Sequence, residues 1–138
     1  MTGSVYYDFW KSGKVIEAHS YAVEGIGEDF FPTTIDIKLI DQMYQFNDKQ
    51  CFETTRQLAR LEGLLTGGSG GAAVRAAIRY AEEIDRPAQI VVLLPDSATR
   101  YLNKVFDDDW MRENGFLDED EAPTNVDGWV STGCAMLD

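Results

Sequence analysis

The sequence predicts an α/β fold with three layers and a mostly parallel sheet. Segments with the patterns of strands and helices alternate along the chain, which is the element order of such folds. Residues 89–94 form a short apolar run, which is typical of a strand buried on both faces of a parallel sheet. The 138 residues, 44% of them hydrophobic, are enough for one domain with a real core. Ligands of such sheets bind beyond the carboxyl ends of the strands.

The first part of the chain is predicted to contain two strands and a glycine loop. Residues 4–9 are rich in tyrosine and alternate loosely, which favours a strand. Residues 18–26 indicate a second strand. It runs into Gly25-Ile26-Gly27, where two glycines allow unusual dihedral angles. Residues 35–44 fit a helical turn that continues into a strand.

The centre of the chain is predicted to hold two helices that flank a second glycine loop. Asn47 is a good N-cap for the first helix, and Gln50 is placed to complement the cap. Apolar residues then follow at helical spacing until Gly63, which ends the helix. Residues 66–71 precede an alanine-rich helix that extends to Ile84.

The last part is predicted to begin with the apolar strand and to end in an acidic tail. Ser97 follows the strand and can cap a helix that continues to Phe106, and a final short helix is expected over residues 109–113. Residues 107–138 carry ten acidic side chains and one basic one, against fourteen and eleven in residues 1–106. We expect this end of the chain to be a solvated tail.

Composition excludes several classes of function. The net charge of −12 argues against a nucleic-acid partner, because phosphates require clustered lysine and arginine. Cys51 and Cys134 match neither a disulfide framework nor a zinc motif, and His19 is the single histidine, so we expect no metal site. The longest aliphatic run is too short to cross a bilayer and no secretory leader is present, so we expect no membrane partner and a cytoplasmic location.

Residues 66–71, Thr-Gly-Gly-Ser-Gly-Gly, are the clearest candidate binding site. Their glycines and hydroxyls precede a helix whose first N–H groups are free, which favours an anion or a polar ligand atom. No lysine follows the glycines, so the loop is not a P-loop, and it does not match G-x-G-x-x-G. The residues alone leave open that Ser69 is merely an N-cap. Gly25 to Gly27 equally fit a β-bulge, and Pro95 to Ser97 a turn.

Several segments together carry a family resemblance. They are Val23-Glu24-Gly25-Ile26-Gly27, Asp29-Phe30 with Pro32, Glu62-Gly63-Leu64-Leu65, Gly67-Gly68-Ser69, and Leu94-Pro95-Asp96-Ser97 with Tyr101. In this order and spacing, from about Gly3 to Leu117, the chain resembles the C-terminal part of fold-type II pyridoxal-phosphate enzymes, the cysteine synthase and cystathionine β-synthase group. Asp109-Trp110-Met111 and Gly115-Phe116-Leu117 resemble the cystathionine β-synthase branch. Glu28 departs from it, since many cystathionine synthases have tyrosine there.

The resemblance implies roles for the matched residues. Ser69 is similar to the serine whose hydroxyl contacts the pyridine nitrogen of pyridoxal 5'-phosphate, and Pro95 to the proline that lies beside the ring. Gly25, Ile26 and Gly27 match the loop that borders the amino-acid substrate. A neutral hydroxyl does not hold the ring nitrogen protonated as a carboxylate would, and this suits β-elimination.

The resemblance also implies parts that this sequence lacks. None of its five lysines matches the lysine to which the family attaches its cofactor, and no loop matches the phosphate clamp, so no catalytic residue is expected in this chain. We therefore expect residues 1–117 to be the C-terminal part of an incomplete catalytic domain of the tryptophan synthase β-like fold, followed by an acidic tail over 118–138. The fragment is expected to be inactive alone. Its partner would be a complementary N-terminal half or a homo-oligomer.

The activity implied is a pyridoxal-phosphate-dependent β-replacement that joins serine, or O-activated serine, with a thiol. For the cystathionine β-synthase branch this means L-serine and L-homocysteine giving cystathionine. The alternative within the family is a cysteine synthase, which joins O-acetylserine and sulfide. An alternative of another class is a non-catalytic remnant or subunit-interaction domain. An open reading frame upstream of Met1 that encodes the lysine and the phosphate loop would favour the enzyme over the remnant.

Overall fold

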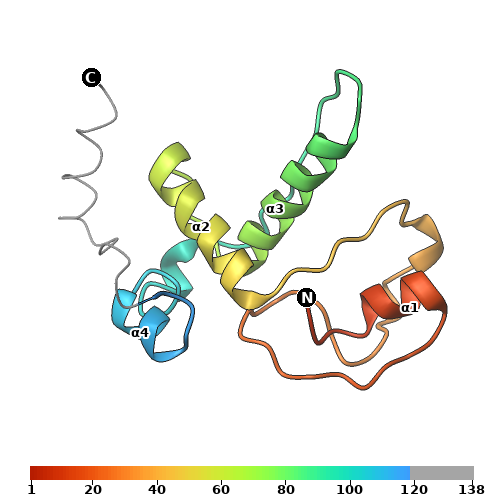
Figure 1. Cartoon of the computed structure of the whole chain (residues 1–138), viewed down its shortest axis with the longest axis horizontal. Coiled ribbons are helices and arrows are strands. Elements are labelled where there is room, and N and C mark those ends of the chain that lie inside the picture. The colour runs from red at the N-terminus through yellow and green to blue at the C-terminus, as the bar shows by residue number, and fades with distance from the viewer. Residues whose placement is uncertain (119–138) are drawn as a thin grey trace.

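The computed structural model describes residues 1–118, which form helices joined by long loops (Figure 1). In this part of the chain the elements follow in the order α1 (Tyr6–Ser12), η1 (Ile37–Leu39), α2 (Asp48–Glu62), α3 (Gly68–Glu83), η2 (Ala98–Arg100) and α4 (Asp108–Glu113). No segment of residues 1–118 lies in a β-strand, and the β-type pairing there is an isolated antiparallel bridge between Thr66 and Ser97. The three-layer sheet expected from the sequence is therefore not seen in these residues.

Helix α2 forms where the sequence predicts it. Asn47 is its N-cap: the Asn47 side chain accepts a hydrogen bond from the Gln50 N–H at 2.9 Å, and the Gln50 side chain accepts one from the Asn47 N–H at 3.1 Å. This reciprocal capping box satisfies two backbone donors that a helix start otherwise leaves free. Gly63 ends the helix with φ 67°, a left-handed conformation that glycine adopts without steric cost.

Helices α2 and α3 cross near their N-terminal halves and diverge toward their C-terminal ends (Figure 1). Glycines at the start of α3 make this crossing close. A Cβ added to Gly71 would lie 2.1 Å from the Thr55 Oγ1 atom and 2.4 Å from the Cys51 carbonyl oxygen, both on α2. A Cβ added to Gly70 would lie 2.0 Å from the Thr66 Oγ1 atom. The glycines are therefore required by packing, whatever ligand the loop binds.

The core lies where α2, the start of α3 and the segment around α4 meet. Phe52 is at its centre, and its ring packs edge-on against Trp110 and Phe116, with centroids 5.8 and 5.0 Å away. Arg56 is 8% exposed, and its guanidinium donates to the Val105 carbonyl oxygen at 2.8 Å and forms an ion pair with Asp108. This buried cation is thus satisfied on both sides and ties α4 to α2.

The strand predicted over residues 4–9 is wrong, because residues 6–9 form the first part of helix α1. Phe9 and Tyr6 both pack against Phe31, with ring centroids 4.7 and 5.5 Å away. These two aromatics are three positions apart and so share a helical face, while their residue type favours strands. Gly13 closes the helix at φ 71°, and its N–H donates to the Phe9 carbonyl at 2.7 Å.

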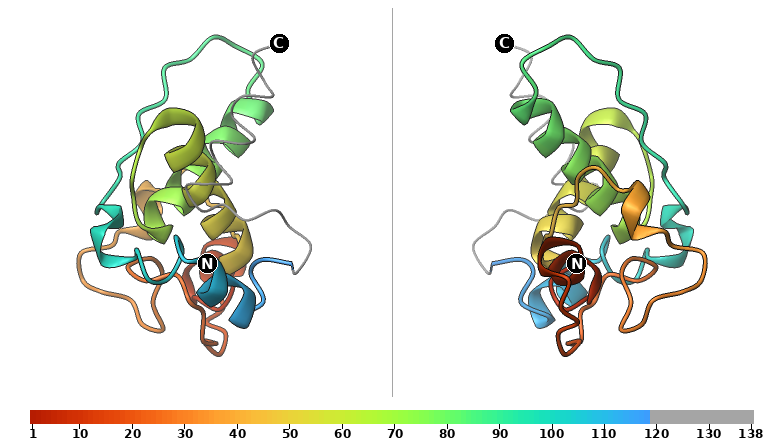
Figure 2. Two further views of the ribbon diagram at one scale, coloured as in Figure 1. Left: turned by 90° about the vertical axis from the view of Figure 1, so that its left-hand side faces the viewer. Right: turned by 90° about the vertical axis from the view of Figure 1, so that its right-hand side faces the viewer.

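The other predicted strands, over residues 18–26, 35–44 and 89–94, are also absent from the described structure. Residues 35–44 contain the short helix η1 and no strand. Residues 89–94 run in an arc away from the helices in both views of Figure 2. A strand requires a hydrogen-bonded neighbour, and these residues have none among residues 1–118. Val91 and Leu93 are consequently 90% and 81% exposed.

The remaining expectations are met in part. The alanine-rich helix is present as α3, ending at Glu83, and the final short helix is present as α4, beginning one residue before the predicted start. The helix expected from Ser97 to Phe106 is wrong, because it is reduced to η2.

The acidic tail lies outside the described residues apart from Asp118. Among the described helices, none combines the length and apolar character needed to cross a bilayer.

The first prediction concerns Gly71. We expect Gly71→Ala to lower the free energy of unfolding by about 1–3 kcal/mol, because the new methyl group overlaps α2. At Ala81, an exposed position of α3, the methyl group is favourable, and Ala81→Gly should cost about 1 kcal/mol by helix propensity. Urea unfolding followed by circular dichroism measures both. A stabilised Gly71→Ala chain would contradict the described crossing.

The second prediction concerns Cys51, a buried free thiol. Burial raises the pKa of the Cys51 thiol from its ordinary value of 9.0 to about 11. The unfolded thiol therefore ionises first, so this group reduces stability as pH rises above 9.0. At pH 8 we expect alkylation of Cys51, in a Cys134→Ser background, to be at least about a hundredfold slower in the folded chain than in urea. Equal rates would show that the thiol is not buried.

Candidate functional site

Ser69 is buried without a hydrogen-bonding partner. It lies in the first turn of α3, is 4% exposed, and its hydroxyl makes no hydrogen bond to any of residues 1–118. Buried hydroxyls are almost always satisfied, so an unsatisfied one calls for an explanation. The alternative that Ser69 is an N-cap is wrong, because the N-cap is Gly67 and Ser69 lies inside the helix.

The start of α3 also leaves backbone donors free. No side chain caps the helix, and the N–H groups of Gly68 and Ser69 have no acceptor among the described residues. Free N–H groups at a helix N-terminus, together with the helix dipole, favour a polar or negatively charged ligand atom. The buried hydroxyl and these donors share one end of one helix.

Asp96 joins the Pro95–Ser97 segment to the glycine loop. One carboxylate oxygen accepts a hydrogen bond from the Gly67 N–H at 3.2 Å, and the other accepts one from the Tyr101 hydroxyl at 2.6 Å. The Asp96 carbonyl oxygen accepts a bond from the Thr66 hydroxyl at 3.1 Å. These contacts hold Pro95, which is exposed, beside the loop that carries Ser69.

The third predicted segment, Gly25 to Gly27, follows residues that pack on the same helix start. Val23, just before it, packs on Gly68, whose added Cβ would lie 3.2 Å from the Val23 side chain. Gly25 and Gly27 have φ values of 76° and 74°, which only glycine adopts readily, and Ile26 packs against the core. Val23 thus places the chain just before this loop against the start of α3, whereas Gly27 itself lies against Ser4 and Tyr21.

An ion pair strengthens this arrangement. Glu24 pairs with Lys104, which connects the 23–27 segment to the chain that follows Asp96. Between these segments a cavity of only about 10 Å³ remains, lined partly by Gly68 and Tyr101. The structure thus brings together the glycine loop, the Pro95–Ser97 segment and the residues just before Gly25.

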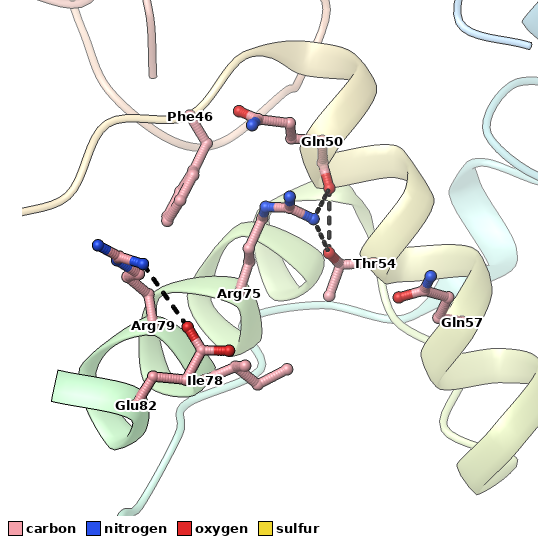
Figure 3. A pocket seen from close by; sticks show the side chains of 8 residues that line it. All are labelled: Phe46, Gln50, Thr54, Gln57, Arg75, Ile78, Arg79 and Glu82. Atoms are coloured by element: carbon pink, nitrogen blue, oxygen red, sulfur yellow. Dashed lines mark hydrogen bonds and ion pairs between the residues drawn. The ribbon is translucent and has the colours of Figure 1, made fainter. Parts of the chain in front are cut away.

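A larger groove, of about 440 Å³, lies between α2 and α3 and does not include Ser69 (Figure 3). Its two arginines are already partnered. Arg75 donates to the Gln50 carbonyl and the Thr54 hydroxyl at 3.4 and 3.2 Å, and Arg79 pairs with Glu82. The described residues also contain no group of three or more histidine, cysteine, aspartate or glutamate side chains that could hold a metal ion.

Two residues of the site were not assigned a role from the sequence. Asp96 was interpreted as part of a turn, and Tyr101 as a helix residue. Burial and the hydrogen bond to Asp96 raise the pKa of Tyr101, with the hydrogen bond the larger cause. The signal that could have identified the pair is an acidic residue directly after the strand-ending proline, five positions before a tyrosine.

Known proteins resemble this chain over most of its length. Residues 2–96 match the protein family described as "Pyridoxal-phosphate dependent enzyme". Cystathionine beta-synthase of Oryctolagus cuniculus is 42% identical over 113 residues, which are 82% of this chain and 20% of that protein. The same enzyme of Saccharomyces cerevisiae is 46% identical over 103 residues, 72% of this chain and 20% of that protein. The chain therefore spans about a fifth of the length of these curated relatives.

A solved structure also matches. The O-acetylserine dependent cystathionine beta-synthase of Helicobacter pylori superposes with a TM-score of 0.63 and 35% sequence identity, covering 74% of this chain and 31% of that one. This neighbour supports the α/β class, although the sheet itself is not formed by residues 1–118. With the family match over residues 2–96, the conclusion is that this chain belongs to the pyridoxal-phosphate dependent enzymes, and that the relatives described here are cystathionine β-synthases.

Proposed function

We propose that this chain forms part of a pyridoxal-phosphate-dependent β-replacement enzyme that joins L-serine and L-homocysteine to give cystathionine. The observation that carries the proposal is the buried Ser69 hydroxyl, which has no protein partner among the described residues. The names of the curated relatives support the choice of reaction. Activated serine is the second candidate for the amino-acid substrate, because the solved neighbour from Helicobacter pylori is described as O-acetylserine dependent. A cysteine synthase has no comparable support.

The residues present fit the cofactor. The Ser69 hydroxyl can donate one hydrogen bond and accept others, which suits a pyridine nitrogen. The two free N–H groups at the start of α3 lie beside it, and Pro95 is exposed and able to lie against a flat ring. We assign Gly25, Ile26 and Gly27 to the substrate-facing wall, where missing side chains leave room. When bound, pyridoxal phosphate supplies the electron sink for the reaction.

The neutral side chain of Ser69 also affects the protonation of the ring nitrogen. A carboxylate in its place would hold the ring nitrogen protonated, whereas a neutral hydroxyl does not impose a charge. The free N–H groups and the positive end of the α3 dipole oppose a further positive charge at this point. Both effects favour an unprotonated ring nitrogen, which is sufficient for losing a β-substituent from serine.

The rest of the site must come from polypeptide outside the described residues. Lys104 lines the small cavity beside Gly68, but it is ion-paired with Glu24. We therefore assign the cofactor-linked lysine and the phosphate loop to a complementary N-terminal part or a second copy. The exposed run over residues 89–94 supports this assignment, because its apolar side chains and unpaired backbone suit a strand inside a parallel sheet. In this proposal residues 1–117 complete the three-layer fold of that domain.

We place the enzyme in the cytoplasm. Cys51 is a free, buried thiol, which is compatible with a reducing compartment. The net charge of −12 makes a nucleic-acid partner unfavourable.

The third prediction tests Ser69 in the assembled holoenzyme. Ser69→Ala should weaken cofactor binding about tenfold and lower kcat/KM for serine by a similar factor or more, because the ring nitrogen loses its hydrogen bond. Ser12→Ala, which removes an exposed hydroxyl that bonds the Asp8 carbonyl in α1, should change neither. Fluorescence titration with pyridoxal phosphate and steady-state kinetics provide the two readouts. Unchanged affinity and rate in Ser69→Ala would remove the basis of the proposal.

The fourth prediction concerns the chain by itself. We expect it to form no cystathionine from serine and homocysteine and to associate in solution through residues 89–94, as size-exclusion chromatography would reveal. Co-expression with a polypeptide that carries the lysine and the phosphate loop should restore turnover. Serine-dependent activity from the isolated chain, or a sharply melting monomer, would contradict the assignment. Absence of turnover in every assembly would favour the non-catalytic remnant.

A further inference from the structure

We propose that Asp96 is a positioning residue that fixes the Ser69 hydroxyl by fastening the glycine loop to the segment after residues 89–94. That the Ser69 hydroxyl binds the cofactor rests on the function proposed above. The fastening itself is a property of the described residues and is testable without any cofactor.

The carboxylate of Asp96 binds two groups that no other described side chain holds. It accepts the Gly67 N–H at 3.2 Å, directly before the helix that carries Ser69, and the Tyr101 hydroxyl at 2.6 Å. Tyr101 is 8% exposed and belongs to the core, so the carboxylate is anchored to a rigid neighbour. A hydrogen bond to a charged acceptor is stronger than a neutral one.

The loop needs such an anchor because its own residues offer little rigidity. Gly67, Gly68 and Gly70 surround Ser69, and glycine loses more conformational freedom on ordering than any other residue. The N-cap, Gly67, has no side chain with which to cap α3. Asp96 supplies the missing side-chain acceptor from a distant part of the chain. Its negative charge is favourable near the positive end of the α3 dipole.

The fit around Gly67 shows how closely the three residues pack. A Cβ added to Gly67 would lie 2.4 Å from the Asp96 Oδ1 atom and 2.5 Å from the Tyr101 ring. The loop backbone therefore rests directly on the carboxylate and the phenol. A shift of Asp96 would be transmitted to Gly67, and through one further glycine to Ser69.

Three variants separate position from charge. Asp96→Ala removes both hydrogen bonds. Asp96→Asn keeps the shape, since the amide oxygen can accept the Gly67 N–H while the amide nitrogen donates to the Tyr101 oxygen. Tyr101→Phe removes one hydroxyl and leaves the Gly67 contact. The matched control is Asp36→Ala, because Asp36 also accepts a backbone N–H, from Lys38 at 3.0 Å, but at the exposed helix η1.

The first readout is amide hydrogen exchange of Gly67, Gly70 and Gly71, the hydrogen-bonded amides of this loop, in the full chain without cofactor. We expect exchange about tenfold faster or more in Asp96→Ala, an intermediate increase in Asp96→Asn and Tyr101→Phe, and no change in Asp36→Ala. The second readout is the assembled holoenzyme. At saturating pyridoxal phosphate the absorption spectrum of the cofactor should change in Asp96→Ala. In a separate titration its dissociation constant should rise about tenfold in Asp96→Ala, with partial rescue in Asp96→Asn.

The outcomes are distinct. Wild-type exchange and spectra in Asp96→Ala would overturn the proposal directly. If Asp96→Ala fails to fold, wild-type exchange and spectra in both Asp96→Asn and Tyr101→Phe would overturn it instead. A lower melting temperature with an unchanged spectrum would also overturn it, because that pattern denotes a merely structural residue. A wild-type assembly that binds no cofactor would refute the proposed function, while the exchange data would still decide whether Asp96 fastens the loop.

Discussion

The close approach of α3 to α2 determines where every other part of the site can be. Gly71 lies against Thr55 and the Cys51 carbonyl with no space for a methyl group, so the start of α3 is held on the core side of α2. Ser69, two residues before this contact, is buried, and the N–H groups of Gly68 and Ser69 at the same helix end remain without an acceptor among the described residues. The glycines serve this packing first, and the space available to a ligand results from it.

Features that depend on neighbours in sequence were predictable. The capping box of Asn47 and Gln50 and the glycine at the end of α2 are local devices, and they appear as predicted. The roles implied for Ser69, Pro95 and Gly25 to Gly27 remain proposals, although the structure places the segments of Ser69 and Pro95 side by side at one helix end.

Features that depend on partners far away in the chain were not predictable from the sequence. Residues 4–9 have strand-forming side chains, but the packing of Tyr6 and Phe9 on Phe31 favours a helix instead. Residues 89–94 have the pattern of a buried strand, yet a pattern does not supply the neighbour that a ladder requires. Asp96 was missed for the same reason, because its three contacts lie 5 to 30 positions away.

The aromatic cluster at the core gives the site an internal optical probe. Phe52 touches the edge of Trp110 on one side, and on the other its ring would lie 2.9 Å from a Cβ at Gly68. The half-buried indole is therefore one aromatic ring away from the start of α3. Rearrangement of the glycine loop alters the surroundings of that indole, so emission from Trp110, in a chain with Trp10 and Trp129 replaced by phenylalanine, follows the loop without an attached label.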